Sequence, residues 1–557
     1  MICCWRAAFW QWRMPSWPWR APVPIVPACR SRKRSISCSA RRTPAMTVML
    51  WRPCFMSPKI GRNGFPGRCR ITVAHKHAGR VLSRPPPASG APVVKMPMIR
   101  SRVPGLIWPG LPGPYGDAHL ALLWQLERSQ WWRADVLHAH QLRQLAVVLA
   151  HAAKNVPFYR AKLAGMDLAA CATSEGWAGL PILTRSDIQA AGAQLRAEAI
   201  PREHGRFHEI QTSGSTGKPI RAFGSDITSF FWNVLTLRGH LWHKHDFSGK
   251  LASIRVFDEG VGSPPKGMSV PAWGHATDVA WITGPGALLN LATASVSQQA
   301  EWLQREAPDY LLTHPSNLAA LVREMGPRPA VLPNLREVWT IAESLDANVR
   351  RFVEEEWQLR VVDTYSSREC GYLATQCPMS DHYHVHSESV LVEVLDDAGQ
   401  PVKPGEVGRV LISTLHNYAT PLLRYEIGDY AEVGAPCPCG RGLPTLSRIV
   451  GRQRNMLTLP DGEKRWPRCG YDQFMDIVPV RQLRLVQRSL HTIDAEIVTE
   501  RPLTESESAA LVGIIHEALG HPFEIRLDYV AEIPRGPGGK FEEFLSAIDR
   551  ASESTET

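Results

Sequence analysis

The sequence predicts an α/β fold: a large, multilayer N-terminal domain whose β-sheets are flanked by helices, then a small α+β domain at the C-terminus. The chain has 557 residues, which is too long for one compact core and indicates two or three domains. Between Leu251 and Val362, helical patterns alternate with short apolar runs, as in layered α/β proteins. We therefore expect the large domain over 96–451 and the small domain over 452–557, after a separate segment 1–95.

The first part of the large domain is predicted to be helical. Past a Pro/Gly-rich stretch at 104–114, apolar residues recur at helical spacing in two runs. Asn155 and Pro157 end the second run, because proline cannot continue a helix. The expected helices cover 120–127, 142–149, 185–198 and 228–240.

Strand patterns dominate the later part of the chain. Residues 389–395 and 408–414 alternate apolar and polar side chains, which predicts a second β-sheet in the large domain. Runs at 483–486 and 495–498 predict strands in the small domain. The sequence contains no apolar run of about 18 residues, so we expect no membrane span.

The charge of the chain is unevenly distributed. Its formal net charge is +10, but residues 1–100 hold 19 Lys and Arg and no Asp or Glu, so the remainder carries −9. The basic balance is therefore no argument that the main body binds nucleic acid or membranes. With 44% hydrophobic and 21% charged residues, the composition is that of an ordinary globular protein.

The segment 1–95 allows three interpretations. A basic arm for nucleic acid or membranes fits the charge, but such arms are poor in the Trp and Cys that are frequent here. A targeting segment would be Arg-rich and acid-free too, but prolines oppose its amphipathic helix. Composition favours the third interpretation, that translation begins near Met96 or Met98.

Six cysteines follow residue 100: Cys171, Cys370, Cys377, Cys437, Cys439 and Cys469. In a chain of this size without a signal peptide, they are expected to be reduced thiols or metal ligands, not a disulfide framework. This expectation corresponds to a cytoplasmic protein.

The run Thr212-Ser213-Gly214-Ser215-Thr216-Gly217-Lys218-Pro219 has the composition of a phosphate-binding loop. Glycines let backbone N–H groups approach an anion, hydroxyls add donors, and Lys218 supplies a flexible charge. The run does not fit the GxxxxGK[ST] pattern, and a run of this kind without other motifs is more often a solvated surface loop.

Four further motifs follow this loop in a fixed order: Tyr365-Ser366-Ser367-Arg368-Glu369, Tyr425-Glu426-Ile427-Gly428-Asp429, Gly451-Arg452 and Gly538-Gly539-Lys540. With them, the sequence resembles the adenylate-forming ligases, the superfamily of the acyl-CoA synthetases. Asn155-Val156-Pro157-Phe158-Tyr159 and Cys437-Pro438-Cys439-Gly440-Arg441 bring it nearest to the phenylacetate-CoA ligase-like branch. The resemblance spans roughly residues 100–545.

This resemblance implies a mobile small domain that rotates about a hinge, here at Arg454, between adenylation and acyl transfer. It also implies ATP and Mg²⁺ as cofactors and coenzyme A as the acceptor. Glu369 matches the metal-binding glutamate of the family, and Thr216 lies in the loop that contacts phosphate. The expected catalytic residues are Lys540, Glu369 and Thr216.

The other expected nucleotide-binding residues are Thr212 to Lys218, Tyr365, Asp429 and Arg452. A carboxylate such as Asp429 can accept hydrogen bonds from both ribose hydroxyls, and Gly428 permits the turn that aims it. Arg452 matches a ribose- and phosphate-contacting arginine of the family, with a surface ion pair as the alternative. Lys540, on a glycine loop, could bridge the attacking carboxylate and the α-phosphate.

A zinc site is a further hypothesis. Cys377, His384, Cys437 and Cys439 offer the S and N ligands that suit tetrahedral Zn²⁺, and members of the resembled branch bear such a structural metal. His386 shares a strand face with His384 and is an alternative ligand. Reduced cysteines without a metal are the alternative to the whole site.

These observations together predict an ATP-dependent carboxylate ligase that forms an acyl adenylate and then an acyl-CoA, with an aryl acid such as phenylacetate favoured. An amine, carrier thiol or hydroxyl acceptor is the first alternative. A nucleic-acid-binding protein with an inactive ligase body, acting through the basic arm, is an alternative of another class. The sequence does not identify the acid or the oligomeric state.

Overall fold

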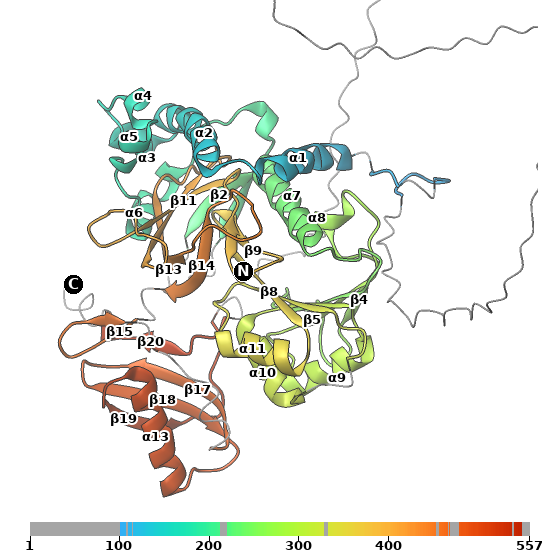
Figure 1. Ribbon diagram of the computed structural model, residues 1–557, viewed down its shortest axis with the longest axis vertical. Helices are drawn as coiled ribbons and strands as arrows, with labels where there is room; N and C mark the ends of the chain where they lie inside the picture. Colours follow the sequence, from blue (N-terminus) through green and yellow to red (C-terminus); the bar gives the residue numbers. More distant parts are fainter. Residues whose placement is uncertain are drawn as a thin grey trace, which may run out of the picture. The chain divides into compact units, whose positions relative to one another are not determined.

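The computed structural model describes residues 101–106, 110–113, 115–211, 220–327, 332–452, 456–465, 467, 478–536 and 540–548. All of them belong to one compact unit, Lys95–Thr557, and Figure 1 draws them as coloured ribbons. The predicted phosphate loop at 212–219, the predicted hinge residue Arg454, Cys469 and the basic segment 1–95 lie outside the described residues.

The described chain opens with helices. The predictions over 120–127 and 142–149 are confirmed by α1 (Gly116–Ser129) and α2 (Ala134–Asn155). Helix α2 ends at Asn155, and Pro157 occupies the first turn of α3 (Pro157–Lys162), where its missing N–H has no helical partner to lose. The other short elements of this region are α4 (Leu168–Cys171), α5 (Ser174–Ala178), α6 (Arg185–Ala191) and the 3₁₀ turns η1 (Gly192–Leu195) and η2 (Arg202–His204).

The helix predicted over 185–198 is wrong in length. Helix α6 ends at Ala191 because Gly192 follows it with φ 50°, a conformation that glycine adopts readily. A 3₁₀ turn then leads to Arg196, whose backbone is extended.

A β-hairpin holds both ends of the predicted phosphate loop. Strands β1 (Phe207–Gln211) and β2 (Arg221–Ser225) are antiparallel, and Gln211 pairs with Arg221. Helix α7 (Asp226–Trp242) follows β2 directly and confirms the helix predicted over 228–240. Segment 212–219 therefore connects two paired strands and precedes a long helix.

A parallel layer forms the middle of the molecule, as the alternating pattern predicts. Strands β3, β5, β6, β7 and β8 run parallel to their neighbours, and β4 pairs antiparallel at the edge. The strands are β3 (Leu251–Arg255), β4 (Met268–Val270), β5 (Gly286–Asn290), β6 (Tyr310–Thr313), β7 (Glu337–Ile341) and β8 (Arg360–Ser367). The connecting helices are α8 (His275–Asp278), α9 (Val296–Glu306), α10 (Pro315–Met325) and α11 (Ala347–Glu356).

Helices cover both faces of this layer. Figure 1 shows α9, α10 and α11 together on one side, where their apolar faces share a buried cluster with the parallel strands. Helix α7 packs closely against Trp339 of β7, since a Cβ at Gly239 would come within 2.9 Å of the indole ring. The two-sided covering explains why these strands read as continuous apolar runs.

The second β region is part of the same sheet, so the prediction of a separate sheet is wrong. Strands β9 to β14 are antiparallel and extend the parallel layer into one twelve-stranded sheet of order β11-β12-β13-β14-β10-β9-β8-β7-β6-β3-β5-β4. Strand β9 pairs with β8 and with β10, which joins the two regions. The strands are β9 (Gly371–Gln376), β10 (Tyr383–Val385), β11 (Val390–Leu395), β12 (Val407–Thr414), β13 (Tyr425–Val433) and β14 (Thr445–Arg452).

The C-terminal part has a sheet and a hydrophobic core of its own. Strands form a four-stranded sheet of order β19-β18-β17-β20, and apolar residues between 457 and 544 make up a separate buried cluster. Strands β17 and β18 contain the two predicted runs, whereas the boundary at 452 stays a prediction. The elements are β15 (Leu457–Thr458), β16 (Lys464–Arg465), β17 (Val480–Gln487), β18 (Thr492–Thr499), α13 (Glu505–Leu519), β19 (Glu524–Tyr529) and β20 (Phe544–Ser546).

None of the helices in the described ranges combines the length and the apolar character that a bilayer span requires.

Candidate active site

Strand order directs attention to one edge of the twelve-stranded sheet. From β3 the chain passes to β5 on one side and then returns to β6 on the other, so the order reverses between β3 and β6. In open α/β sheets, ligands bind beyond the carboxyl ends of the strands at such a reversal. The residues that follow β3, β6, β7 and β8 are therefore the candidates for a ligand site.

A cross-strand ion pair lies next to the end of β8. Asp429 of β13 is the register partner of Arg452 at the end of β14, and the Arg452 Nε lies 3.2 Å from the Asp429 Oδ1. The Tyr365 hydroxyl of β8 donates a 2.9 Å hydrogen bond to the other carboxylate oxygen. Gly428 has φ 84°, which supports the predicted turn before Asp429. Three predicted nucleotide-binding residues thus form one hydrogen-bonded group.

The pKa shifts of this group agree with its burial. Burial, followed by the neighbouring Asp429 carboxylate, raises the pKa of Tyr365 well above its ordinary value, so the phenol remains a donor. Burial opposes the charge of Arg452, but Asp429 and then Glu369 raise its pKa. Arg452 therefore remains a cation at any working pH.

Glu369 lies in the turn between β8 and β9, directly beyond the carboxyl end of β8. The residue is only 8% exposed, and its charge acts on Arg452. A buried carboxylate beside cations is suited to hold a hard metal ion together with phosphate oxygens.

Lys540 lies among the same charges, although it comes more than 80 residues later than Arg452 in the sequence. Burial and then Arg452 lower the pKa of Lys540, whereas Asp429, Glu343 and Glu369 oppose that shift. The structure thus brings together Tyr365, Glu369, Asp429, Arg452 and Lys540.

Glu343 fixes the segment that carries Lys540, and the sequence interpretation missed it. The Phe541 backbone N–H donates a 2.8 Å hydrogen bond to the Glu343 Oε1, and the Ser316 N–H donates a 2.9 Å bond to the Oε2. The Arg535 guanidinium also donates to the Ser316 hydroxyl at 2.7 Å. Glu343 follows β7, as Glu369 follows β8, and this position after a buried strand was the available signal.

The remaining predicted nucleotide ligands, Thr212 to Lys218, lie outside the described residues. Their roles stay predictions, and only the β1–β2 hairpin that flanks them is described.

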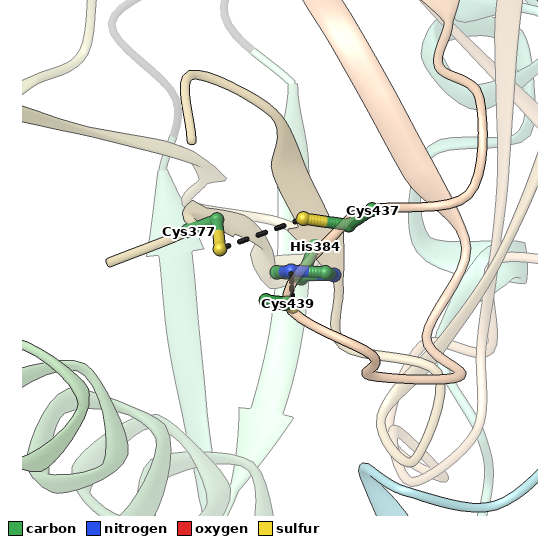
Figure 2. A group of neighbouring side chains, drawn as sticks. All are labelled: Cys377, His384, Cys437 and Cys439. Carbon is green, nitrogen blue, oxygen red and sulfur yellow. Dashed lines mark hydrogen bonds between the residues drawn. The ribbon is translucent and has the colours of Figure 1, made fainter. Parts of the chain in front are cut away.

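A second cluster consists of the predicted zinc ligands. Figure 2 shows Cys377, His384, Cys437 and Cys439 facing one another, and their ligand atoms all lie within 4.8 Å of each other. The Cys377 and Cys437 sulfurs are 3.6 Å apart, and the Cys439 sulfur lies 3.2 Å from the His384 Nε2. Three sulfurs and one imidazole are a donor set that suits tetrahedral Zn²⁺.

His384, not His386, faces the thiols. The His386 ring is engaged elsewhere, with its Nε2 2.9 Å from the Thr375 hydroxyl and its Nδ1 3.4 Å from the Arg238 guanidinium. Burial, and then Arg441, lowers the pKa of His384 to about 4, so its imidazole is neutral and able to bind a metal at neutral pH. The alternative between the two histidines is thereby decided by geometry.

Comparisons with known proteins agree with this geometry. The model of the AMP-binding enzyme family matches residues 209–419, a segment that starts in β1 and includes Tyr365 and Glu369. The chain is 27% identical to the phenylacetate-coenzyme A ligase of Thermus thermophilus over 349 residues, 58% of this chain and 72% of that protein. It is 25% identical to the phenylacetate-coenzyme A ligase of Pseudomonas putida over 360 residues, 62% and 76% of the two chains.

Among solved structures, a 2-hydroxyisobutyryl-CoA ligase in the postadenylation state has the same fold. The TM-score is 0.58 at 18% identity, over 77% of this chain and 94% of that one. Residues 209–419 therefore match the AMP-binding enzyme family, and more than half of the chain is similar in sequence to phenylacetate-coenzyme A ligases.

Proposed function

We propose that this ligase activates an aryl carboxylic acid of the phenylacetate type with ATP and transfers the acyl group to coenzyme A. The two phenylacetate-coenzyme A ligase relatives support both the acid class and the acceptor. The observation that carries the proposal is the convergence of Lys540, Arg452, Asp429 and Glu369 beyond the carboxyl end of β8. Such a site can hold the negatively charged carboxylate of the acid next to the negatively charged triphosphate of ATP, which adenylation requires.

In the first half-reaction, a carboxylate oxygen of the acid attacks the α-phosphorus of ATP. The new C–O–P bond forms as the bond to the pyrophosphate oxygen breaks, and pyrophosphate leaves with the electron pair. The proposed role of Lys540 is to bridge the incoming carboxylate and an α-phosphate oxygen, so that charge moving between them stays screened. Asp429 would accept from the ribose hydroxyls while Tyr365 and Arg452 hold its carboxylate in place.

Mg²⁺ fits this site because a magnesium ion in a nucleotide site is usually held by one or two carboxylates plus substrate phosphates. Glu369 would hold it together with phosphate oxygens of ATP, and the ion would neutralise phosphate charge during adenylation.

In the second half-reaction, the thiolate of coenzyme A attacks the acyl carbon of the adenylate. The C–S bond forms, the C–O bond to AMP breaks, and AMP leaves as the phosphate anion. An amine, a carrier-protein thiol or a hydroxyl as acceptor would give the same first half-reaction. Product analysis with coenzyme A, glycine, a phosphopantetheine-bearing carrier protein and glycerol as competing acceptors separates these possibilities.

Acid-dependent exchange between ATP and labelled pyrophosphate tests the proposed adenylation. A panel of aryl and aliphatic acids, assayed with the full chain and with a chain that begins at Met96, should give exchange with aryl acids at equal rates for both lengths. Exchange with aliphatic acids alone would overturn the acid class. Absence of exchange with every acid, despite measurable ATP binding, would overturn the proposed function.

We also propose that Cys377, His384, Cys437 and Cys439 hold one structural Zn²⁺. Four protein ligands leave no open position for substrate, which favours a structural role. Burial raises the pKa of Cys437, so a cation in the cluster would stabilise the thiolate it needs there.

Metal analysis tests the zinc proposal. The purified protein should contain one zinc per chain, and the Cys437→Ser variant should lose it and unfold at a lower temperature. Cys171→Ser is the matched control, because Cys171 is buried elsewhere, and it should keep its zinc. Equal zinc content in the two variants would contradict the site.

A further inference from the structure

Arg255 is a half-buried cation that the proposed mechanism does not use. It is the last residue of β3, so it stands at the carboxyl edge, beside the reversal of strand order between β3 and β6. Its Nε is shut off from solvent and has no hydrogen-bond partner. Among the described residues, none forms an ion pair or a side-chain hydrogen bond with this guanidinium.

The groups around Arg255 connect it to the candidate active site. Tyr372 and Arg368 are the charged or ionisable neighbours that act on it, and these two residues flank Glu369 in the sequence. Burial lowers the pKa of Arg255, Tyr372 opposes that shift, and Arg368 adds to it. Arginine nevertheless stays charged in proteins, so the edge holds a cation without a carboxylate of its own.

Two aromatic side chains, Phe257 and Tyr372, lie near this cation. The Arg255 guanidinium carbon lies 5.4 Å from the centroid of the Phe257 ring. The Tyr372 ring contacts Trp232 of α7, with centroids 4.8 Å apart, and the Tyr372 hydroxyl accepts a 3.2 Å hydrogen bond from Thr236. Trp232 is 36% exposed, so this aromatic group reaches the surface of the protein.

The charges near Arg255 differ from those near Lys540. Lys540 is acted on by Arg452, Asp429, Glu343 and Glu369, and Arg255 is not among these groups. Asp429 and Glu369 belong to the proposed nucleotide and metal site, whereas Arg255 has aromatic neighbours and no carboxylate. This difference favours the acid, and not the phosphate chain of ATP, as the ligand of Arg255.

A half-buried guanidinium without an anion is unfavourable where its Nε has lost water, because no hydrogen bond replaces the lost hydration. The planar fork of an arginine matches a carboxylate through two parallel hydrogen bonds. The carboxylate that is adenylated must instead lie between Lys540 and the α-phosphate. The anion that compensates Arg255 would therefore be a second group on the same acid.

We propose that Arg255 binds a second carboxylate on the acid substrate, so that this ligase prefers an aryl dicarboxylic acid to the corresponding monoacid. This inference rests on the proposed function, since it concerns the acid of that same site. One carboxylate is adenylated near Glu369, and the other stays free and paired with Arg255 at the end of β3. The aromatic ring between them lies against Phe257 and Tyr372.

Matched pairs of acids test the inference. Phenylacetate is compared with its 2-, 3- and 4-carboxy derivatives in ATP–pyrophosphate exchange, using the full-length wild type and the Arg255→Met and Arg255→Lys variants. For at least one diacid, the wild-type kcat/KM should exceed that for phenylacetate by about tenfold or more, the scale of one charged hydrogen-bonded pair. Arg255→Met should remove this preference, and Arg255→Lys should restore it in part. Arg202→Met, at an exposed position, should leave it unchanged.

Calorimetric titration with the same acids, without ATP, separates the two hypotheses. Diacid binding that is lost in Arg255→Met supports the inference even if no ATP–pyrophosphate exchange is detected. In that case only the proposed adenylation is contradicted. Exchange at equal rates with monoacids and diacids, unchanged in Arg255→Met, would overturn the inference and leave the proposed function intact. A variant that raises the KM for ATP equally with every acid would assign Arg255 to the nucleotide and also overturn the inference.

Discussion

Asp429 and Arg452 occupy paired strands of one large sheet, whereas Lys540 lies in an irregular segment before β20. The first two residues are positioned by the backbone ladder of β13 and β14 and by the Tyr365 hydroxyl. The Lys540 segment is held by the bond from the Phe541 N–H to Glu343, in the segment after β7, and by the bond from Arg535 to Ser316, at the start of α10.

This difference indicates a division of labour. Residues in strands keep one arrangement throughout a catalytic cycle, whereas a segment held by a few polar bonds can leave at small energetic cost. We expect the strand residues to serve both half-reactions and the Lys540 segment to serve adenylation only. Each prediction below measures the two half-reactions separately.

Lys540→Ala should have the largest effect. Removing the charge that screens the attacking carboxylate should reduce the rate of adenylation by about 10²–10³-fold, the loss typical of one preorganised electrostatic donor. Thioester formation from a synthetic acyl adenylate should be unchanged. Lys403→Ala, at an exposed position, is the control. Equal losses in both half-reactions would contradict the division of labour.

Asp429→Asn should have a smaller effect on both half-reactions. The neutral amide loses the ion pair with Arg452 and the charged acceptor for the ribose, so the KM for ATP should rise about 10–100-fold. Binding of the acyl adenylate should weaken to a similar extent in the thioester assay. Asp397→Asn, on an exposed turn, should change neither. A defect confined to adenylation would count against a nucleotide role for Asp429.

Glu343→Gln should reduce adenylation about tenfold, because the Phe541 N–H would bond to a neutral acceptor instead of a charged one. Thioester formation should not fall. The matched control is Glu355→Gln, on the exposed face of α11. Identical rates for Glu343→Gln and the wild type would show that this bond does not position Lys540.

The smallest expected effect is a change in pH dependence. In the proposed mechanism adenylation needs protonated Lys540, so we expect full activity below the pKa of this group and loss of activity as pH rises through it. Glu343 is one of the charges that raise this pKa, and its neutralisation should lower the pKa further. The alkaline limb of the exchange rate should therefore move to lower pH in Glu343→Gln. An alkaline limb that moves to higher pH in Glu343→Gln would contradict the assignment of this limb to Lys540.

Sequence patterns predicted much of the fold. Helices α1, α2 and α7 follow from their apolar periodicity, and the alternation between Leu251 and Val362 corresponds to the parallel layer. Patterns report on local structure, however. They did not reveal that strands β11 to β14 belong to the same sheet as the parallel layer, because β14 joins that sheet by pairing with β10, a contact between segments distant in sequence.

The candidate site was predictable where the chemistry sits in a recognisable motif. Asp429, Glu369 and Lys540 lie in such motifs, and the structure brings their charges together. Glu343 and Arg255 carry no motif signal, since one is a single acid after a strand and the other a single base at a strand end. Only the folded structure shows that Glu343 accepts a hydrogen bond from the Phe541 N–H and that the Arg255 Nε has no hydrogen-bond partner.

The bond between Glu343 and Phe541 has a consequence for how this enzyme tolerates mutation. Its donor is a main-chain N–H, which every residue except proline supplies, so position 541 can vary freely without loosening the bond. Its acceptor is a side chain, so the whole contact depends on what occupies position 343. Among variants of this chain, a change at position 343 or a proline at position 541 therefore determines whether the Lys540 segment can be held in place. Substitutions at these two positions could weaken adenylation to different degrees without altering any group that touches the substrates.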